Sequence, residues 1–174
     1  MEIKKIITGA LDENCYVLIK NNTCLVVDPG DDFKKIKEQI GDNKILGVLI
    51  THSHFDHIGA LRNFLTKRSI KIFKRSNLEE KEYEIGDFKF KCIYTPGHSK
   101  DSVTFYFEDD NVMFDGDFIF KESIGRTDLP SGNDKEMKDS IEKILQYDEN
   151  IKLYPGHNEE TTIKHEKDNN QYLN

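Results

Sequence analysis

Short apolar runs separated by polar residues fill the beginning of the chain and predict strands. Ile3–Thr8, Tyr16–Ile19 and Cys24–Val27 are rich in apolar residues, and the Asn21-Asn22 pair between the last two is typical of a hairpin turn. Ile45–Ile50 is almost entirely apolar, as expected for a strand that is covered on both faces. The first third of the chain is therefore predicted to consist largely of short strands.

Two helices are predicted in the first half by apolar residues that recur every three or four positions. The first is expected to begin at Asp31 or Asp32, either of which can cap it, and to end at Gly41-Asp42-Asn43. The second follows residue 57. The apolar faces consist of Phe33, Ile36 and Ile40 in the first helix and of Ile58, Leu61, Phe64 and Leu65 in the second.

The second half repeats this arrangement of strands and helices. Apolar and lysine residues alternate through Phe88–Tyr94, and Val103–Phe107 and Asn111–Phe114 form a predicted hairpin. A helix then precedes the short strand Ile151–Tyr154, and a final polar helix is expected to run through about Glu166. The apolar face of the first of these helices is formed by Met137, Ile141, Ile144 and Leu145. Strands and helices in both halves indicate two sheets with helices outside them.

Side chains that can bind metal ions follow the predicted strands. Residues 51–57 read Thr-His-Ser-His-Phe-Asp-His, so three of the six histidines directly follow the strand Ile45–Ile50. Loops at one edge of a sheet can bring such residues together, which is the usual ligand position in open α/β sheets. Other apolar runs are followed by Asp28, His98, Asp117 and His157.

These residues favour a metal site over a set of exposed loop residues, because interleaved imidazoles and carboxylates are costly to bury without partners. Nitrogen and oxygen ligands without thiolates suit Zn²⁺, Fe²⁺ or Mn²⁺. The groups are too many for one tetrahedral ion, but they suit two ions that share Asp117 and keep open positions for water. Such a water can have its pKa lowered to about 7, which is hydrolytic chemistry. The candidate ligands are His52, His54, Asp56, His57, His98, Asp117 and His157.

The composition narrows the class of protein. A chain of 174 residues with 36% hydrophobic and 33% charged residues is expected to form one soluble domain spanning 1–174. The net charge of −7 argues against nucleic-acid binding. The basic run between Arg62 and Arg75 is expected to be a solvated surface rather than an anion site.

The expected cellular location is based on the absence of a membrane span and of a signal peptide from the sequence. No apolar run is long enough to cross a membrane, and the N-terminus lacks the apolar core of a signal peptide. The three cysteines, Cys15, Cys24 and Cys92, have no Cys-x-x-Cys spacing and are expected to be reduced residues of strands. We expect a cytoplasmic monomer or small homo-oligomer that acts on a small molecule, without nucleic-acid or membrane partners.

The order and spacing of several short motifs resemble those of the metallo-β-lactamase superfamily. Residues 125–128, Gly-Arg-Thr-Asp, are similar to its glyoxalase II (hydroxyacylglutathione hydrolase) branch. The resemblance implies an α+β fold, an αββα sandwich of two mixed sheets packed face to face, with helices outside and the metals at one edge. The motifs are Asp28-Pro29-Gly30, the histidine-rich residues 51–57, Pro96-Gly97-His98, Gly116-Asp117 and Pro155-Gly156-His157.

The resemblance also implies the position of each metal ligand. Zn²⁺ is the expected ion at both positions, with Fe²⁺ or Mn²⁺ as alternatives. The first ion would be held by His52, His54 and His98, and the second by Asp56, His57 and His157, with Asp117 bridging the two.

Three carboxylates have implied roles beyond simple ligation. Asp56 would orient the metal-bridging hydroxide that attacks the substrate, and Asp117 would hold the two ions together. Asp28 would fix a ligand imidazole from behind, although it fits equally well as a turn residue that leads into a helix.

The implied reaction is hydrolysis of a thioester such as S-lactoylglutathione, with attack of the hydroxide on the carbonyl and departure of a thiolate. Two features differ from full-length glyoxalase II. The chain ends about seventeen residues after His157, so the C-terminal helical domain that helps to hold glutathione is expected to be absent, as in shorter relatives. His157 is followed by Asn158 rather than the common glycine, and asparagine tolerates left-handed backbone well.

Candidate substrate contacts lie close to Asp117 in the sequence. Arg126 is a candidate for binding an anionic substrate group, although a salt bridge with Asp128 is the favoured alternative. Phe118–Phe120 is expected to form an apolar wall by the metals or part of the core. His165, in the polar C-terminal helix, is expected to lie on the surface.

Other functions compete with thioester hydrolysis. Persulfide dioxygenases share the fold but use one iron and oxygen, and the complete set of second-metal ligands favours the hydrolase over them. A secreted β-lactamase is disfavoured by the absence of a signal peptide, and the RNA-processing branch by the acidity and the absence of a long inserted arm. The flavodiiron scaffold requires glutamate where His54 stands. A non-enzymatic metal-binding domain predicts the loss of ligands, and none is lost.

Overall fold

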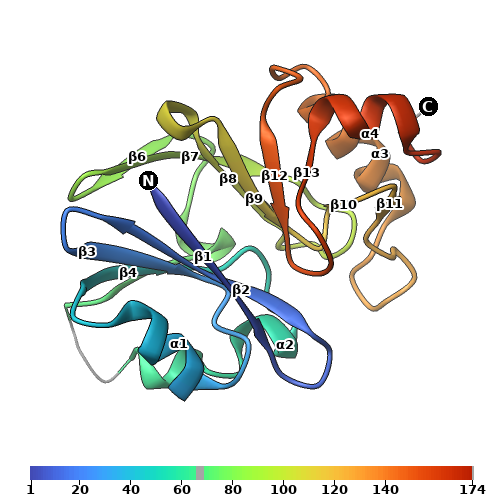
Figure 1. The fold of residues 1–174 in the computed structure, drawn as a ribbon. Coiled ribbons are helices and arrows are strands. Elements are labelled where there is room, and N and C mark those ends of the chain that lie inside the picture. The colour runs from blue at the N-terminus through green and yellow to red at the C-terminus, as the bar shows by residue number, and fades with distance from the viewer. Residues whose placement is uncertain (66–68, 174) are drawn as a thin grey trace.

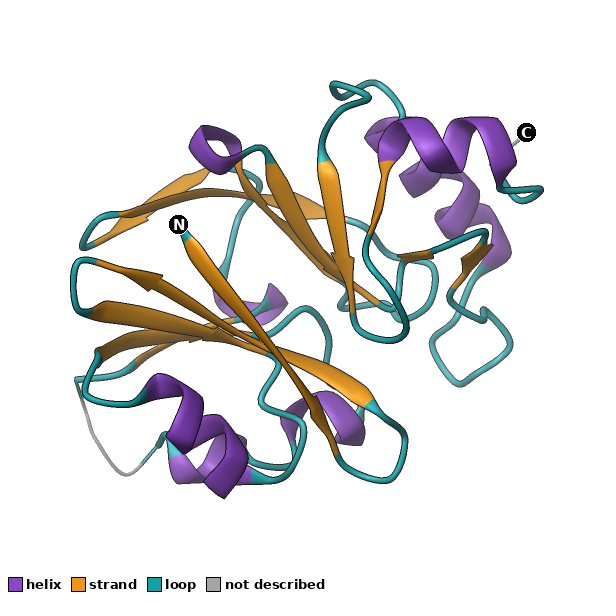
Figure 2. Cartoon of the chain, viewed as in Figure 1, coloured by secondary structure: helices purple, strands orange, loops and turns teal. Residues whose placement is uncertain are grey.

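Two β-sheets pack face to face and carry helices on their outer faces (Figure 1, Figure 2). The computed structural model describes residues 1–65 and 69–173. Helices α1 and α2 lie on the outer side of the first sheet, and α3 and α4 lie on the outer side of the second (Figure 1). The predicted αββα sandwich of two mixed sheets is thereby confirmed.

The first sheet comes from the N-terminal half and has the strand order β1-β2-β3-β4-β5. Its first three strands are antiparallel, whereas β3, β4 and β5 are parallel to one another. The strands span Glu2–Thr8, Glu13–Lys20, Thr23–Val27, Lys44–Leu49 and Lys71–Phe73. Its helices are α1 at Phe33–Ile40, α2 at Phe55–Ile58 and the short 3₁₀ helix η1 at Leu61–Asn63.

The second sheet comes from the C-terminal half and has the order β13-β12-β9-β8-β7-β6. Only the β12–β9 pair is parallel among its described strands. The strands β6 to β9 span Glu82–Ile85, Phe88–Tyr94, Val103–Phe107 and Val112–Gly116, and β12 and β13 span Lys152–Pro155 and Thr161–Thr162. A separate hairpin, β10–β11, spans Ile119–Phe120 and Ser123–Ile124. The helices are η2 at Arg75–Asn77, η3 at Glu108–Asp110, α3 at Asp134–Ile144 and α4 at Ile163–Asn169.

The main core lies between the two sheets and is rich in aromatic rings. Leu18, Leu25 and Leu49 of the first sheet face phenylalanines of the second. Phe90 and Phe105, for example, pack edge to face with ring centroids 5.7 Å apart. Two further clusters join the outer face of each sheet to its helices. Burial of both faces of each sheet leaves the strand ends as the place where polar groups can gather.

Most predicted elements are found, with two local differences. The Asn21-Asn22 turn is among the predictions that are confirmed, with the positive φ angles of 46° and 58° that tight hairpins require.

The two differences concern helices. The helix predicted after residue 57 is instead the one-turn α2 followed by η1, and Leu65 is 60% exposed rather than on a buried face. Asp32 occupies the cap position of α1, but its side chain does not cap the helix. It accepts bonds from the amide of Gly9 and from Lys35 instead.

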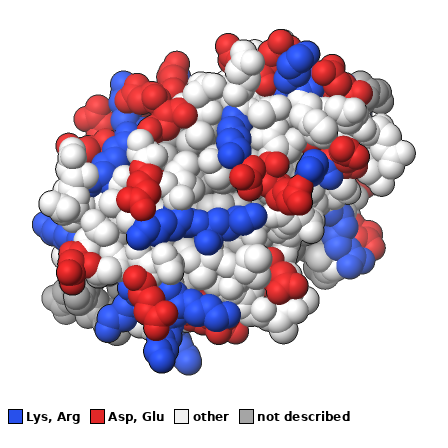
Figure 3. Space-filling view, in the orientation of Figure 1, with Lys and Arg blue, Asp and Glu red and all other residues white. Residues whose placement is uncertain are grey.

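The face shown in Figure 3 carries side chains of both charges, and the basic and acidic groups are interspersed over it. The predicted basic run is dispersed over η1, β5 and η2, with Arg75 stacked 3.5 Å from the ring centroid of Tyr94, and its Lys67 and Arg68 lie outside the described residues. No helix within the described ranges is long and apolar enough to cross a membrane.

Candidate metal centre

The strand ends of both sheets bring seven candidate ligands into one cluster, and five of the seven line a cavity of about 850 Å³. Residues after β4 and in α2 come from the first sheet, and residues after β7, β9 and β12 come from the second. Every candidate ligand from the sequence lies in this cluster. They are His52, His54, Asp56, His57, His98, Asp117 and His157.

One group consists of three imidazoles. Nδ1 of His54 lies 3.1 Å from Nε2 of His52 and 2.9 Å from Nε2 of His98. Burial, and secondarily the neighbouring imidazoles, lower the pKa of His52 well below its usual range and also lower that of His54. Neutral imidazoles with converging nitrogen atoms are suitable metal ligands.

A main-chain contact sets the orientation of the third imidazole. Nδ1 of His98 lies 2.7 Å from the carbonyl oxygen of Arg126 and, as the donor to that carbonyl, carries the proton. The lone pair of His98 is then on Nε2, which faces the other two imidazoles.

The second group contains a carboxylate and two imidazoles. Nε2 of His157 lies 3.3 Å from Oδ2 of Asp56, and Nε2 of His57 lies 3.8 Å from the same oxygen. Burial raises the pKa of Asp56, but the imidazoles of His157 and His57 outweigh burial and lower it. Asp56 is therefore ionised at neutral pH and can act as a ligand.

Asp117 lies between the two groups and contacts both. Its Oδ1 is 3.2 Å from Nε2 of His57, and its Oδ2 is 3.5 Å from Nε2 of His98 and 3.6 Å from Nε2 of His157. One carboxylate thus presents an oxygen to each group.

The buried atoms around Asp117 fit a cation. Among the described residues neither Nε2 of His57 nor Oδ1 of Asp117 has a hydrogen-bond partner, because the 3.2 Å contact between them lacks hydrogen-bond geometry. Burial lowers the pKa of His57, but the carboxylates of Asp117 and Asp28 outweigh it and raise the pKa well above its usual range. The site therefore favours positive charge, and a divalent ion would satisfy both unpaired atoms.

Asp28 lies behind His57 and is 2% exposed. Its Oδ2 is 2.9 Å from Nδ1 of His57. It also accepts hydrogen bonds from the amide and the hydroxyl of Thr51, at 2.8 and 2.5 Å. These contacts are the ones expected of a carboxylate that orients an imidazole, and the φ angle of 45° at Asp28 also fits a turn, so its role stays a prediction.

Sequence reasoning missed Glu13, which is buried at the first position of β2. Its Oε2 accepts a hydrogen bond of 2.7 Å from Thr8, and its Oε1 lies 3.9 Å from Nδ1 of His57. Burial raises the pKa of Glu13 to about 9, against the opposing effect of His57. The only signal was the polar pair Glu13-Asn14 directly before an apolar strand.

Three further predictions concern residues at or near the mouth of the cavity. The guanidinium group of Arg126 forms a bidentate salt bridge with Asp128, at 2.6 and 2.8 Å, as the favoured alternative predicted. Phe118 and Ile119 are each 1% exposed and belong to the core, whereas Phe120 lines the cavity. Asn158 has φ 66°, the left-handed backbone that its residue type tolerates.

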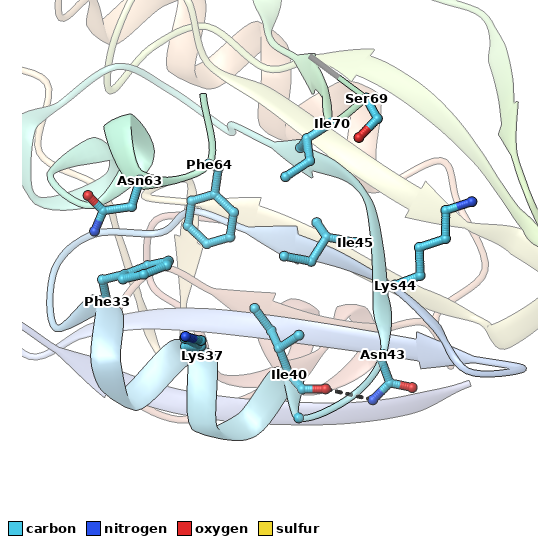
Figure 4. Close-up of a pocket in the computed structure, with 11 residues that line it drawn as sticks. Phe33, Lys37, Ile40, Asn43, Lys44, Ile45, Asn63, Phe64, Ser69 and Ile70 are labelled. Carbon is cyan, nitrogen blue, oxygen red and sulfur yellow. Dashed lines mark hydrogen bonds between the residues drawn. The ribbon is translucent and has the colours of Figure 1, made fainter. Parts of the chain in front are cut away.

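A second cavity, of about 670 Å³, lies between α1 and the residues around Phe64 and Ile70 (Figure 4). Its lining residues include Phe33, Lys37 and Ile45, but no histidine, cysteine, aspartate or glutamate among the residues that the structure describes. Because metal ligands and acid–base groups are concentrated at the first cavity, the chemistry is assigned there.

Comparisons with known proteins agree with this geometry. A family model described as the metallo-beta-lactamase superfamily matches residues 8–82 and 76–157. Among curated proteins, the probable metallo-hydrolase YqgX of Bacillus subtilis is 33% identical over 100% of this chain and 98% of that protein. A hydroxyacylglutathione hydrolase of Francisella philomiragia is 32% identical over 90% of this chain and 68% of its own length.

Solved structures show the same fold. The B3 metallo-beta-lactamase BLEG-1 has a TM-score of 0.91 and 32% identity, with 99% of both chains covered. TTHA1623, solved in a di-iron-bound form, has a TM-score of 0.87 and 27% identity over 97% of this chain and 99% of that chain.

Proposed function

Because the chain belongs to the metallo-β-lactamase superfamily and thus to a class of metal-dependent hydrolases, we propose that it hydrolyses thioesters with a dinuclear metal centre. The relative named hydroxyacylglutathione hydrolase, whose name denotes a thioester substrate, supports this chemistry. The two groups of converging nitrogen and oxygen atoms support two ions rather than one.

Each ion is assigned to one of the two groups. His52, His54 and His98 would hold the first ion, Asp56, His57 and His157 would hold the second, and Asp117 would be shared. Bound divalent ions would polarise the thioester carbonyl and lower the pKa of a water molecule at the centre. Zn²⁺ suits these ligands best, and the di-iron form of TTHA1623 makes Fe²⁺ the main alternative.

The protein's side chains orient the reactants. The carboxylate of Asp56, half-buried at the cavity floor, accepts a hydrogen bond from the attacking water and so directs its lone pair at the carbonyl carbon. A carbon–oxygen bond forms and the carbon–sulfur bond breaks, and the proton lost by the water ends on the thiolate or in solvent. The products are a carboxylic acid and a thiol.

No cysteine of the protein acts as the nucleophile. Cys15, Cys24 and Cys92 are all buried. Burial raises the pKa of the thiols of Cys24 and Cys92 to about 11 and about 12, and it raises the pKa of Cys15 well above its usual range. All three are protonated and inaccessible at neutral pH, so water is the nucleophile.

The observation that carries the proposal is the position of Asp117 between the two groups. Asp117→Ala should lower the metal content from two ions to one and reduce thioester turnover by about a thousandfold. Metal analysis and steady-state hydrolysis of S-lactoylglutathione and other thioesters measure the two effects. Asp139→Ala, which removes an exposed carboxylate of α3, is the control. Unchanged turnover in Asp117→Ala would refute the proposal.

Two alternatives predict different results from the same protein. A persulfide dioxygenase would contain one iron per chain and consume oxygen with glutathione persulfide, without cleaving thioesters. A non-enzymatic metal-binding domain would bind two ions but leave a broad panel of thioesters, esters and phosphodiesters intact.

A further inference from the structure

We propose that the mouth of the metal-centre cavity selects thioesters that carry a neutral, apolar group instead of an anionic one. This inference rests on the proposed thioester hydrolysis and adds the substrate class. It follows from the kinds of side chain that surround the cavity and from the pairing of the charges there.

One wall of the mouth carries two large apolar side chains that are exposed to solvent. Phe55, in α2 between the ligands His54 and Asp56, is 74% exposed. Leu11, in the turn between β1 and β2, is 53% exposed. Both line the cavity that contains the metal ligands. Apolar surface gains free energy when it is removed from water, so an apolar ligand group would be favoured against it.

A second wall is also apolar and comes from the β10–β11 hairpin and the loop that follows it. Phe120 and Ile124 belong to the β10–β11 hairpin and are half-buried, and Phe120 packs edge to face with the ring of His157 at 6.2 Å. The wall consists of Phe120, Ile124, Leu129 and Pro130. A ligand whose carbonyl lies at the metal ligands would extend between two apolar walls.

The charges at the mouth do not favour an anion. Among the described residues that line the cavity, Arg126 is the one lysine or arginine. Both of its guanidinium contacts go to Asp128, which neutralises its charge and would repel an approaching carboxylate. Thiol carriers with several carboxylates, such as glutathione, therefore find no free cationic partner among the described residues that line this mouth.

Two thiols that differ only in charge provide the test. Phenylacetyl thioesters of 3-mercaptopropanesulfonate and of 3-mercaptopropyl methyl sulfone share the acyl group and the distance from sulfur to the polar head. Because a sulfonate binds metal ions only weakly, a difference between the two thioesters reports on the charge preference of the mouth rather than on binding to the metal ions. The corresponding phenethyl thioethers cannot be hydrolysed and allow binding to be measured by calorimetry on the metal-loaded protein.

The neutral member of each pair should be preferred by about tenfold, in kcat/KM for the thioesters and in Kd for the thioethers. Phe55→Ala should raise KM for the neutral phenylacetyl thioester several-fold and leave its acetyl counterpart little changed. Leu65→Ser is the matched control, because Leu65 is 60% exposed but does not line this cavity. Arg126→Gln leaves Asp128 without its cationic partner and should therefore increase the preference for the neutral substrate rather than reduce it.

Equal or reversed preference within the pairs, or a Phe55→Ala variant with unaltered KM values, would overturn the inference. The proposed function fails in a distinguishable way. Absence of hydrolysis with a tenfold preference among the thioethers would reject thioester hydrolysis and retain the apolar ligand class. Hydrolysis without any preference between neutral and anionic substrates would retain thioester hydrolysis and reject the apolar ligand class.

Discussion

The two sheets hold their metal ligands by different means. In the N-terminal half, buried polar side chains support the imidazoles, as Asp28 and Thr51 do for His57 and His52. In the C-terminal half, the support comes from the main chain, as when the carbonyl of Arg126 orients His98. The support of His57 and His52 depends on charge and hydrogen bonding, whereas the support of the loops that carry Asp117 and His157 depends on how closely backbone segments can approach.

Glycine makes the close approach in the C-terminal half possible. A Cβ atom at Gly116 would lie 2.3 Å from Oγ1 of Thr51, and one at Gly156 would lie 2.4 Å from Oδ1 of Asp117. The amide of Gly156 donates to the carbonyl of Gly116, at 2.8 Å, and the amide of Asn14 donates to the carbonyl of Gly156, at 2.7 Å. These contacts tie the loops that carry Asp117 and His157 to β2.

The difference implies that steric changes in the C-terminal half have larger effects than isosteric changes in the N-terminal half. A hydrogen-bond network can lose one charge and keep its shape, whereas overlapping atoms must move. Substitutions that range from a steric clash to the isosteric removal of a charge test this comparison between the two halves.

The largest effect is expected for Gly156→Ala. Its Cβ would meet both Oδ1 of Asp117 and, at 2.5 Å, Cε1 of His57, so the shared carboxylate and a ligand imidazole must both shift. We expect turnover to fall by about a hundredfold or more and the free energy of unfolding to fall by about 1–3 kcal/mol. Kinetics, metal analysis and urea denaturation measure these losses.

Gly41→Ala separates the steric effect from a general cost of replacing glycine. Gly41 follows α1, has φ 58° and has no atom within 4 Å of an added Cβ. Backbone strain should reduce the free energy of unfolding by about 1–3 kcal/mol, with full metal content and turnover. If Gly156→Ala behaved like Gly41→Ala, main-chain packing would not be what positions Asp117.

An intermediate effect is expected for Asp28→Asn, which keeps the shape of the side chain and removes its charge. The amide would still accept a hydrogen bond from Thr51 but would support the imidazole of His57 less strongly. Metal affinity should therefore fall by about 10- to 100-fold, measured by competition with a chelator. Asp31→Asn, at an exposed neighbouring position, should leave the affinity unaltered. Equal affinities in the two variants would show that Asp28 serves only the turn.

The two halves also differ in how easily their metal ligands could be predicted from the sequence. His52, His54 and His57 are visible because one strand end carries them within a few positions. His98 and Asp117 are separated along the chain, and only the shared pattern of strand followed by ligand, together with the family resemblance, connects them.

Contacts that depend on packing between distant segments could not be predicted. Glu13 is polar and precedes a strand, so only the folded structure shows that it is 1% exposed and close to His57. The prediction of a longer helix after residue 57 was wrong because it too depended on packing between distant segments. Its apolar spacing was correct, but α2 ends after one turn at Gly59, where an added Cβ would lie 2.2 Å from the carbonyl oxygen of Gly30.

The smallest effect on turnover is expected for Glu13→Gln, whose effect on the free energy of unfolding should depend on pH. Burial raises the pKa of Glu13 from 4.5 to about 9 in the folded protein. Below pH 4.5 the carboxyl group is protonated in both states and its contribution to stability is complete. Between pH 4.5 and about 9 the unfolded chain loses this proton and the folded protein keeps it, so the wild type becomes less stable as pH rises.

Glutamine does not titrate, and it has the shape of the protonated side chain. The unfolding free energy of Glu13→Gln relative to the wild type should therefore increase from pH 5 to pH 8, by at most about 1.4 kcal/mol per pH unit. Urea denaturation at each pH measures the difference, and histidine titrations common to both proteins cancel. Glu38→Gln, at an exposed position of α1, should give a constant difference. A constant difference for Glu13→Gln as well would mean that Glu13 is ionised in the folded protein, and the N-terminal support would then be a fully charged network.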